Sequence, residues 1–140
     1  MREILFRGKR EDNQWEYGNY YIAEKLDKSG VEYFIINIDA EGSQHYVIPE
    51  TVGECSGVPD NNCIKIFEGD ILESRASENK EDRKRWIVTF HDGSFCFERE
   101  IPRKYKHKHE QNLLCADQVK LYGLVVIGNI HDNSELLKGE

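Results

Sequence analysis

The sequence has few of the features that mark exported, membrane-bound or metal-binding proteins. No apolar run among its 140 residues approaches the roughly 18 residues of a membrane span, and the apolar stretch near its start is too short for a signal peptide. Its cysteines lack the close pair spacing of a zinc knuckle. They are Cys55, Cys63, Cys96 and Cys115. We therefore expect a soluble protein with reduced, structural cysteines.

Motifs of the common enzyme classes are also missing. The sequence contains no glycine-rich phosphate loop, no Gly-x-Ser-x-Gly elbow and no His-Glu-x-x-His helix. Catalysis requires a nucleophile, a base or a metal whose surroundings orient it or shift its pKa. The sequence thus predicts a protein that is not an enzyme and uses neither a cofactor nor a metal.

Basic residues are too few to balance the acidic ones, and the formal net charge is -7. Such a charge opposes non-specific attraction to nucleic-acid phosphates. One segment, residues 99–109, is nevertheless basic, and it also contains a tyrosine and two histidines. Its cations are Arg99, Arg103, Lys104, Lys106 and Lys108. This mixture is typical either of a nucleic-acid patch or of an exposed loop or edge strand, and we favour the second interpretation.

The residues that are abundant indicate a β protein. Aromatic residues make up 11% of the chain, whereas methionine occurs once, a composition that favours strands over a helical bundle. We predict a mostly β fold in which an N-terminal antiparallel β-meander, residues 1–52, packs against a C-terminal SH3-like small β-barrel, residues 53–140. The two subdomains are expected to form one integrated unit, with short helical turns at connectors and at the C-terminus.

Apolar runs and turn residues predict the less regular elements. Pro49–Gly53 is a connector that could carry one helical turn. Gln118–Ile130 is long and apolar enough for a central strand. Ser134–Leu137 is expected to form a final helical turn, capped by Asp132 or Asn133.

A turn of sequence Glu68-Gly69-Asp70 interrupts the apolar stretch Ile64–Leu72. Gly69 allows the positive φ that a sharp bend needs, so we interpret this stretch as a corner of the barrel. Glu68 and Asp70 could hold a divalent cation on one side of the strand. Alternatively, Asp70 could accept hydrogen bonds from backbone N–H groups and fix the bend, as aspartate commonly does in turns. We favour this structural role.

The clearest local pattern is Asp92-Gly93 between two alternating apolar strands, which specifies a two-residue type I′ hairpin. Placing these two residues in the loop fixes the register of the flanking strands. The expected pairs are His91 with Ser94, Phe90 with Phe95, and Val88 with Phe97.

An aromatic row is expected on the second strand, where Trp15, Tyr17 and Tyr21 share a parity. Rings on one face of a sheet can form a ligand platform, but core or subunit-interface packing is commoner. We favour packing for this row.

Three segments of the chain, taken together in order and spacing, resemble the YopX family. They are Arg2–Arg10 with Trp15 and Tyr17-Gly18, Pro49–Gly53 through Gly57 to Ile66–Ile71, and Val126–Ile130 with Asp132-Asn133 and Glu135–Leu137. The sequence departs from the family pattern at Gln14, Cys63, His131 and Ser134, and Cys63 stands where the family usually has the glycine of an Asn-Gly turn. These departures affect loops and leave the strand framework intact.

The resemblance implies a phage or prophage protein in the cytoplasm of an infected or lysogenic bacterium. It carries over no catalytic residues. The first hypothesis for function is a non-catalytic accessory protein that acts by protein binding or self-association as a homo-oligomer through exposed aromatic surface. The alternative is a nucleic-acid-binding module that uses the basic segment 99–109.

Overall fold

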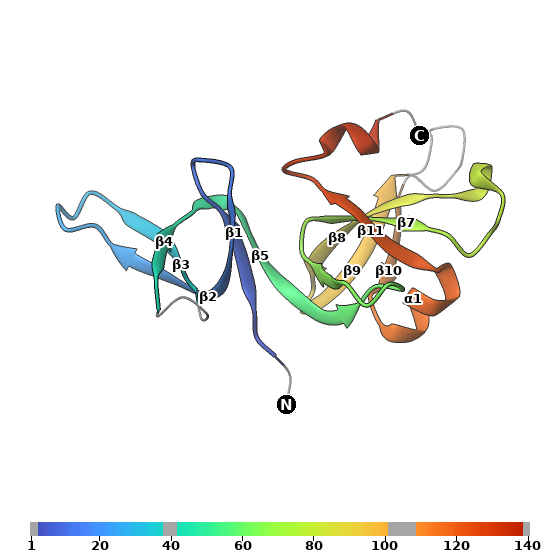
Figure 1. The fold of residues 1–140 in the computed structure, drawn as a ribbon, viewed down its shortest axis with the longest axis horizontal. Coiled ribbons are helices and arrows are strands. Elements are labelled where there is room, and N and C mark those ends of the chain that lie inside the picture. The colour runs from blue at the N-terminus through green and yellow to red at the C-terminus, as the bar shows by residue number, and fades with distance from the viewer. Residues whose placement is uncertain (1–2, 38–41, 101–108, 139–140) are drawn as a thin grey trace. The chain divides into compact units, whose positions relative to one another are not determined.

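The computed structural model describes residues 3–37, 42–100 and 109–138 and confirms that the protein is mostly β (Figure 1). Two antiparallel sheets contain most of these residues, with one α-helix and two short 3-10 turns. The chain divides into two compact units, residues 1–55 and residues 56–140. The boundary predicted from sequence lies between Val52 and Gly53. Among the described residues, no helix has the length and apolar character needed to cross a membrane.

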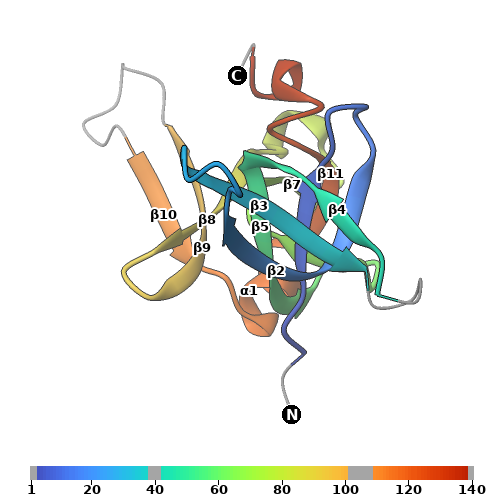
Figure 2. The same ribbon diagram turned by 90° about the vertical axis from the view of Figure 1, so that its left-hand side faces the viewer.

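The first unit is built from an opening hairpin and the strands that flank it. β1 (Phe6–Lys9) lies between β2 (Trp15–Glu24) and β5 (Ile48–Pro59), antiparallel to both. β3 (Val31–Asn37) and β4 (Gln44–Tyr46) continue the sheet on the far side of β2, and Figure 2 shows these strands side by side.

Ile35 and Val47 form the centre of the first unit, and both have 0% exposure. Val47 is the residue between β4 and β5, and its N–H donates to the carbonyl of Tyr33 at 3.0 Å. Gly8 on β1 leaves room for it, since a Cβ at position 8 would lie 2.9 Å from Val47 Cβ. The chain therefore passes from β4 to β5 around a buried valine rather than through an exposed loop.

The prediction of a helical turn at Pro49–Gly53 is wrong, because these residues belong to β5. The pairing of β5 with β1 shifts register between Arg7 and Lys9, so the ladder contains an irregularity opposite the proline. Thr51 Oγ1 accepts a hydrogen bond from Lys9 N at 2.8 Å and donates one to Ile48 O at 2.6 Å. A proline, which cannot donate to a ladder, is tolerated at such a bulge.

The second unit contains a five-stranded antiparallel sheet in the order β10-β9-β8-β7-β11. Its strands are β7 (Asp70–Ser74), β8 (Arg85–His91), β9 (Ser94–Glu100), β10 (His109–Leu113) and β11 (Leu124–Asn129). A short strand, β6 (Lys65–Phe67), pairs with β5. The strand pairings of the described residues do not close this sheet into the predicted barrel, although they fit the predicted all-β class.

The core of the second unit is aromatic at its centre. Trp86 packs edge-on against Phe97, with ring centroids 5.0 Å apart, and against Tyr122 at 5.9 Å. Other buried members of this cluster are Ile66, Leu72, Val88, Leu114, Val119 and Leu124. Edge-to-face ring pairs contribute stabilisation beyond their buried area, so Trp86 is the central packing residue of the second unit.

The hairpin at Asp92-Gly93 has the predicted register. His91 pairs with Ser94, Phe90 with Phe95 and Val88 with Phe97. Asp92 has a φ of 50° and Gly93 a φ of 80°, and positive φ at both central positions is the requirement of a type I′ turn.

The prediction of one long strand at Gln118–Ile130 is wrong in its first part. Residues Ala116–Tyr122 form the helix α1, and only Leu124–Asn129 form β11. Val119 and Tyr122, three positions apart, both belong to the aromatic core, a spacing that places side chains on one helix face. Gly123 ends the helix in the left-handed conformation with φ 60°, the usual role of glycine after a helix.

The final turn forms at Ser134–Leu137 as predicted, but Asn133, one of the two proposed caps, does not cap it through its side chain. Asn133 occupies the position before the turn without a side-chain cap hydrogen bond. Its Oδ1 instead accepts a hydrogen bond from Asn129 N at 3.2 Å. Arg85 Nη1 donates to Leu136 O at 2.6 Å and so attaches the C-terminal turn to β8.

Candidate functional site

The Glu68-Gly69-Asp70 turn joins β6 to β7 and contains a buried carboxylate. Asp70 is 2% exposed, and its Oδ2 accepts a hydrogen bond from Phe67 N at 2.8 Å. Gly69 has a φ of 89°, its N–H donates to Val88 O at 2.8 Å, and its carbonyl accepts from Ile130 N at 2.9 Å. The turn is thus bonded to both β8 and the end of β11, and its geometry is that of a structural corner.

Asp60 is a second buried carboxylate, which the sequence analysis did not identify. It is 4% exposed and follows β5. Oδ1 accepts hydrogen bonds from Asn62 N and Ile64 N, each at 2.8 Å, and Oδ2 accepts one from Val126 N at 2.9 Å. The local part of this pattern is the Asx-turn, which an aspartate followed by two asparagines could have indicated. No pattern in the residues next to Asp60 predicts its hydrogen bond with Val126 of β11.

Cys63 closes the turn that Asp60 begins. Its N–H donates to Asp60 O at 3.0 Å, and its φ is 63°. Residues other than glycine have a strained backbone in this left-handed region. The conformation suits the glycine that the family resemblance places at this position. The exposed Cys63 thiol is therefore held on a strained backbone.

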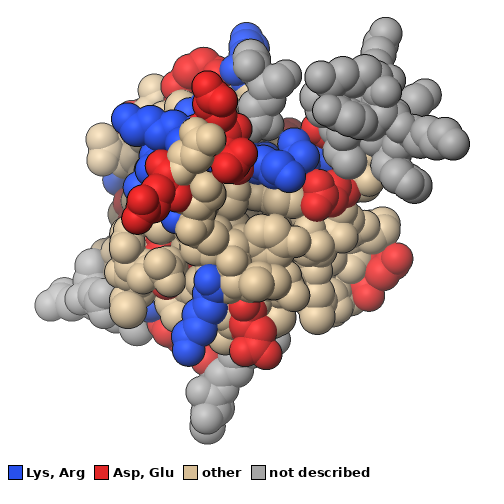
Figure 3. Space-filling model, turned by 90° about the vertical axis from the view of Figure 1, so that its right-hand side faces the viewer, with Lys and Arg blue, Asp and Glu red and all other residues tan. Residues whose placement is uncertain are grey.

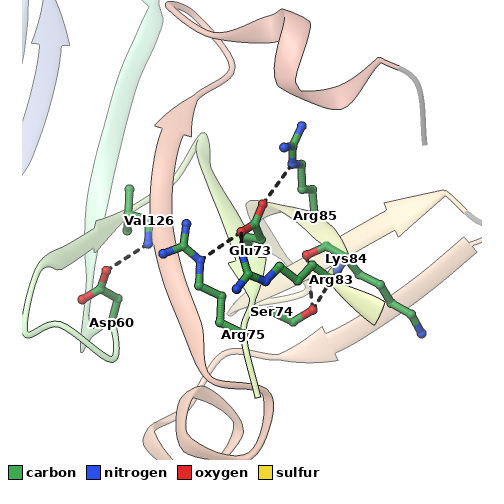
Figure 4. Close-up of polar contacts among 8 residues, drawn as sticks. All are labelled: Asp60, Glu73, Ser74, Arg75, Arg83, Lys84, Arg85 and Val126. Carbon is green, nitrogen blue, oxygen red and sulfur yellow. Dashed lines mark hydrogen bonds and ion pairs between the residues drawn. The ribbon is translucent and has the colours of Figure 1, made fainter. Parts of the chain in front are cut away.

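Three arginines surround one buried glutamate where β7 and β8 are joined by a loop, and we call this group the arginine cluster (Figure 4). Glu73 on β7 is 7% exposed. Arg75 Nε donates to its Oε1 at 2.9 Å, and Arg85 Nε donates to its Oε2 at 3.2 Å. Arg83 Nη1 lies 3.8 Å from Oε1. Local sequence patterns do not reveal this group, because its members belong to two strands and the loop between them.

The charges in the arginine cluster set the ionisation of Glu73. Burial alone would raise the pKa of the carboxyl, but the hydrogen bonds and charges of Arg75 and Arg85 outweigh burial and hold the pKa below its usual value. A carboxylate that remains ionised accepts the hydrogen bonds of Arg75 and Arg85, so these two contacts stabilise the protein at neutral pH.

The lowered pKa of Glu73 predicts an acid-sensitive contribution to stability. We expect the contribution to be fully present above the unfolded pKa of about 4.3 and to be lost as the pH falls through the lower folded pKa. Glu73→Gln should reduce the free energy of unfolding by about 1 to 2 kcal/mol at neutral pH. Urea unfolding of both proteins over an acid-to-neutral pH series checks this, and a difference that does not shrink on acidification would contradict it.

Only one of the five residues predicted to bind nucleic acid, Arg99, lies among the described residues. Arg99 on β9 donates from Nε to Glu110 Oε2 at 3.2 Å, lies over the Trp86 ring at 5.3 Å, and has a side chain that is 14% exposed. A phosphate at this position would compete with Glu110. The other four cations, Arg103, Lys104, Lys106 and Lys108, lie outside the described residues.

Residues that could bind a metal do not come together among the described residues. No group of three or more histidine, cysteine, aspartate or glutamate side chains in those ranges is arranged to hold an ion. Cys55 and Cys96 are buried, whereas Cys63 is exposed.

An aromatic face crosses three strands of the first unit, and we define it as Tyr21, Phe34 and Tyr46. Tyr21 pairs with Phe34 across β2 and β3, and Phe34 pairs with Tyr46 across β3 and β4. The ring centroids are 5.2 Å and 5.5 Å apart, respectively. Tyr46 is 44% exposed. Of the aromatic row predicted on this strand, Tyr21 belongs to the aromatic face. Trp15 instead lies under the Arg7 guanidinium, whose Cζ is 4.8 Å from the ring centroid.

Comparison with known proteins identifies the family. The model of the family described as YopX protein matches residues 5–138. The chain belongs to the YopX family. No curated protein matches it.

Two solved structures share the fold of this YopX family member. A crystal structure of protein EF1440 from Enterococcus faecalis has a TM-score of 0.60 at 23% sequence identity. The match covers 99% of this chain and 100% of the EF1440 chain. The crystal structure of protein yopX from Bacillus subtilis has a TM-score of 0.54 at 19% sequence identity. The match covers 100% of this chain and 99% of the yopX chain. These similarities establish a shared YopX fold over the whole chain.

Proposed function

We propose that this protein is a non-catalytic phage or prophage accessory protein of the bacterial cytoplasm that acts by binding protein, in the first instance a second copy of itself. The observation that supports the proposal is the aromatic face of the first unit. Aromatic rings in contact across neighbouring strands, one stacked pair and one edge-on pair with an exposed end, are the kind of surface that is enriched at protein interfaces.

The partners of the buried carboxylates support a non-catalytic role. Asp60 and Asp70 accept hydrogen bonds from backbone N–H groups, and Glu73 is held by arginines. A catalytic carboxylate needs access to a substrate proton or atom. Each of these three groups instead fixes a turn or a loop.

One member of the aromatic face is exposed enough to reach another molecule, since Tyr46 is 44% exposed. Tyr17, outside the face but of the same parity as Tyr21 on β2, is 45% exposed. Tyrosine combines a large apolar ring with a hydroxyl that remains solvated before binding. This makes Tyr46 a suitable anchor that can be changed without disturbing the core.

Analytical ultracentrifugation of the purified chain tests self-association. We expect a concentration-dependent dimer at micromolar protein, which Tyr46→Lys should shift to monomer because it places a charge in the interface. Ile22→Lys is the matched control, because it introduces the same charge: Ile22 is 53% exposed on the same strand as Tyr21 but has the opposite parity. A strictly monomeric wild type, or equal effects of the two substitutions, would refute self-association through this face.

Affinity capture from infected cells, with and without nuclease, separates a protein partner from nucleic acid. We expect the captured protein to be unaffected by nuclease and to be lost with Tyr46→Lys. Capture that disappears on nuclease treatment would contradict the proposal and favour the nucleic-acid alternative.

A further inference from the structure

The arginine cluster has more positive charge than its glutamate requires. Both carboxylate oxygens of Glu73 already accept a charged hydrogen bond, one from Arg75 and one from Arg85. Arg83 adds a third guanidinium at 3.8 Å, a distance too long for a hydrogen bond. Among the described contacts of the cluster, three guanidinium groups thus face one carboxylate, in a chain whose net charge is -7.

Arg83 also has an unsatisfied donor. Its Nε is buried and has no hydrogen-bond partner among the described residues. A buried N–H without an acceptor is costly, and like charges held together repel. An anion in contact with the exposed part of these guanidinium groups would relieve the repulsion between them, whereas the buried Nε lies out of its reach.

The cluster is accessible to such an anion. The side chains of Arg75, Arg83 and Arg85 are 43%, 30% and 33% exposed, respectively, while that of Glu73 is 9% exposed. The carboxylate therefore lies beneath the guanidinium groups and orients them. In Figure 4 they extend around Glu73, whereas the Lys84 amine points away from it.

From these contacts we propose that Arg75, Arg83 and Arg85 form a binding site for a phosphate group. Guanidinium groups present planar, forked donors that match the oxygens of phosphate. On the face shown in Figure 3, acidic and basic side chains are intermingled where they gather. The site belongs to the second unit and uses none of the residues of the aromatic face, so either proposal can fail without the other.

Isothermal titration calorimetry at low salt tests the site with three probes: inorganic phosphate, pyrophosphate and a single-stranded oligonucleotide. We expect at least one probe to bind the full chain. Binding of phosphate or pyrophosphate identifies a free phosphate compound as the source, whereas binding of the oligonucleotide alone identifies a nucleic-acid backbone. Absence of binding by all three would overturn the proposal.

Arg83→Gln is the decisive variant, because Arg83 lies 3.8 Å from Glu73 and the substitution removes no hydrogen bond to that carboxylate. We expect it to weaken binding by about tenfold or more, since a charged hydrogen bond to phosphate is lost. Lys84→Gln removes the same charge at the next residue, whose backbone, not its side chain, contacts Ser74, and should change affinity by less than about twofold.

Arg75→Gln provides a second test if Arg83→Gln fails to fold, and it should also weaken binding. Circular dichroism and urea unfolding establish that each variant is folded. Equal losses for Arg83→Gln and Lys84→Gln would show that only diffuse charge attracts the probe and would overturn the site.

Discussion

Replacing Gly18 with alanine is expected to destabilise the first unit by about 3 kcal/mol or more, because the added methyl group has no space. Gly18 lies in β2, paired with Phe6 on one side and Asn37 on the other. A Cβ there would overlap the backbone carbonyl oxygen of Ile36. That atom belongs to the backbone of β3, so a side-chain rotation cannot relieve the clash and the strands must separate.

Urea unfolding followed by far-ultraviolet circular dichroism measures this loss. Asn19→Ala is the control: it changes the next residue, whose side chain is exposed, and should alter stability by less than about 0.5 kcal/mol. A Gly18→Ala protein as stable as wild type would show that β2 and β3 do not approach as closely as described.

Asp60→Ala is expected to cost about 3 kcal/mol, since it removes a charged acceptor from three backbone N–H groups at once. Two of these groups, Asn62 N and Ile64 N, belong to the turn after β5, and the third, Val126 N, belongs to β11. The substitution should therefore loosen the turn and weaken its attachment to β11, where the hydrogen bond from Asn61 N to Leu124 O remains.

Hydrogen exchange distinguishes this mechanism from general destabilisation. The amides of Ile64 and Val126 should lose protection first in Asp60→Ala, ahead of amides in the β8–β9 hairpin. Asn62→Ala, at an exposed position in the same turn, is the control and should leave protection unchanged. Uniform loss of protection across the sheet would contradict the proposed role of Asp60.

Short-range patterns predicted parts of the fold well. Asp92-Gly93 determined both the turn type and the register of β8 with β9, because a two-residue loop leaves the flanking residues one way to pair. The Glu68-Gly69-Asp70 turn was likewise recognisable, since glycine and aspartate have specific turn roles. In both cases the interacting groups are a few residues apart.

Predictions failed where the local pattern was ambiguous. Gln118–Ile130 is apolar enough for a strand, yet its first part is helical because Val119 and Tyr122 pack on the Trp86 cluster from one helix face. Pro49 suggested a break in the chain, yet β5 continues through it beside an irregular part of its ladder with β1. Tertiary packing outweighed local preference at both places.

The sequence by itself determined the family, the all-β class and the tight turns of this protein. Only the tertiary structure brings together the residues on which the proposals rest. Arg83 and Arg85 meet Glu73 only because β8 returns alongside β7, Asp60 meets Val126 across 66 positions, and Tyr21, Phe34 and Tyr46 align only through the registers of three strands. Contacts between residues far apart in the chain depend on strand pairing, which local sequence patterns do not encode.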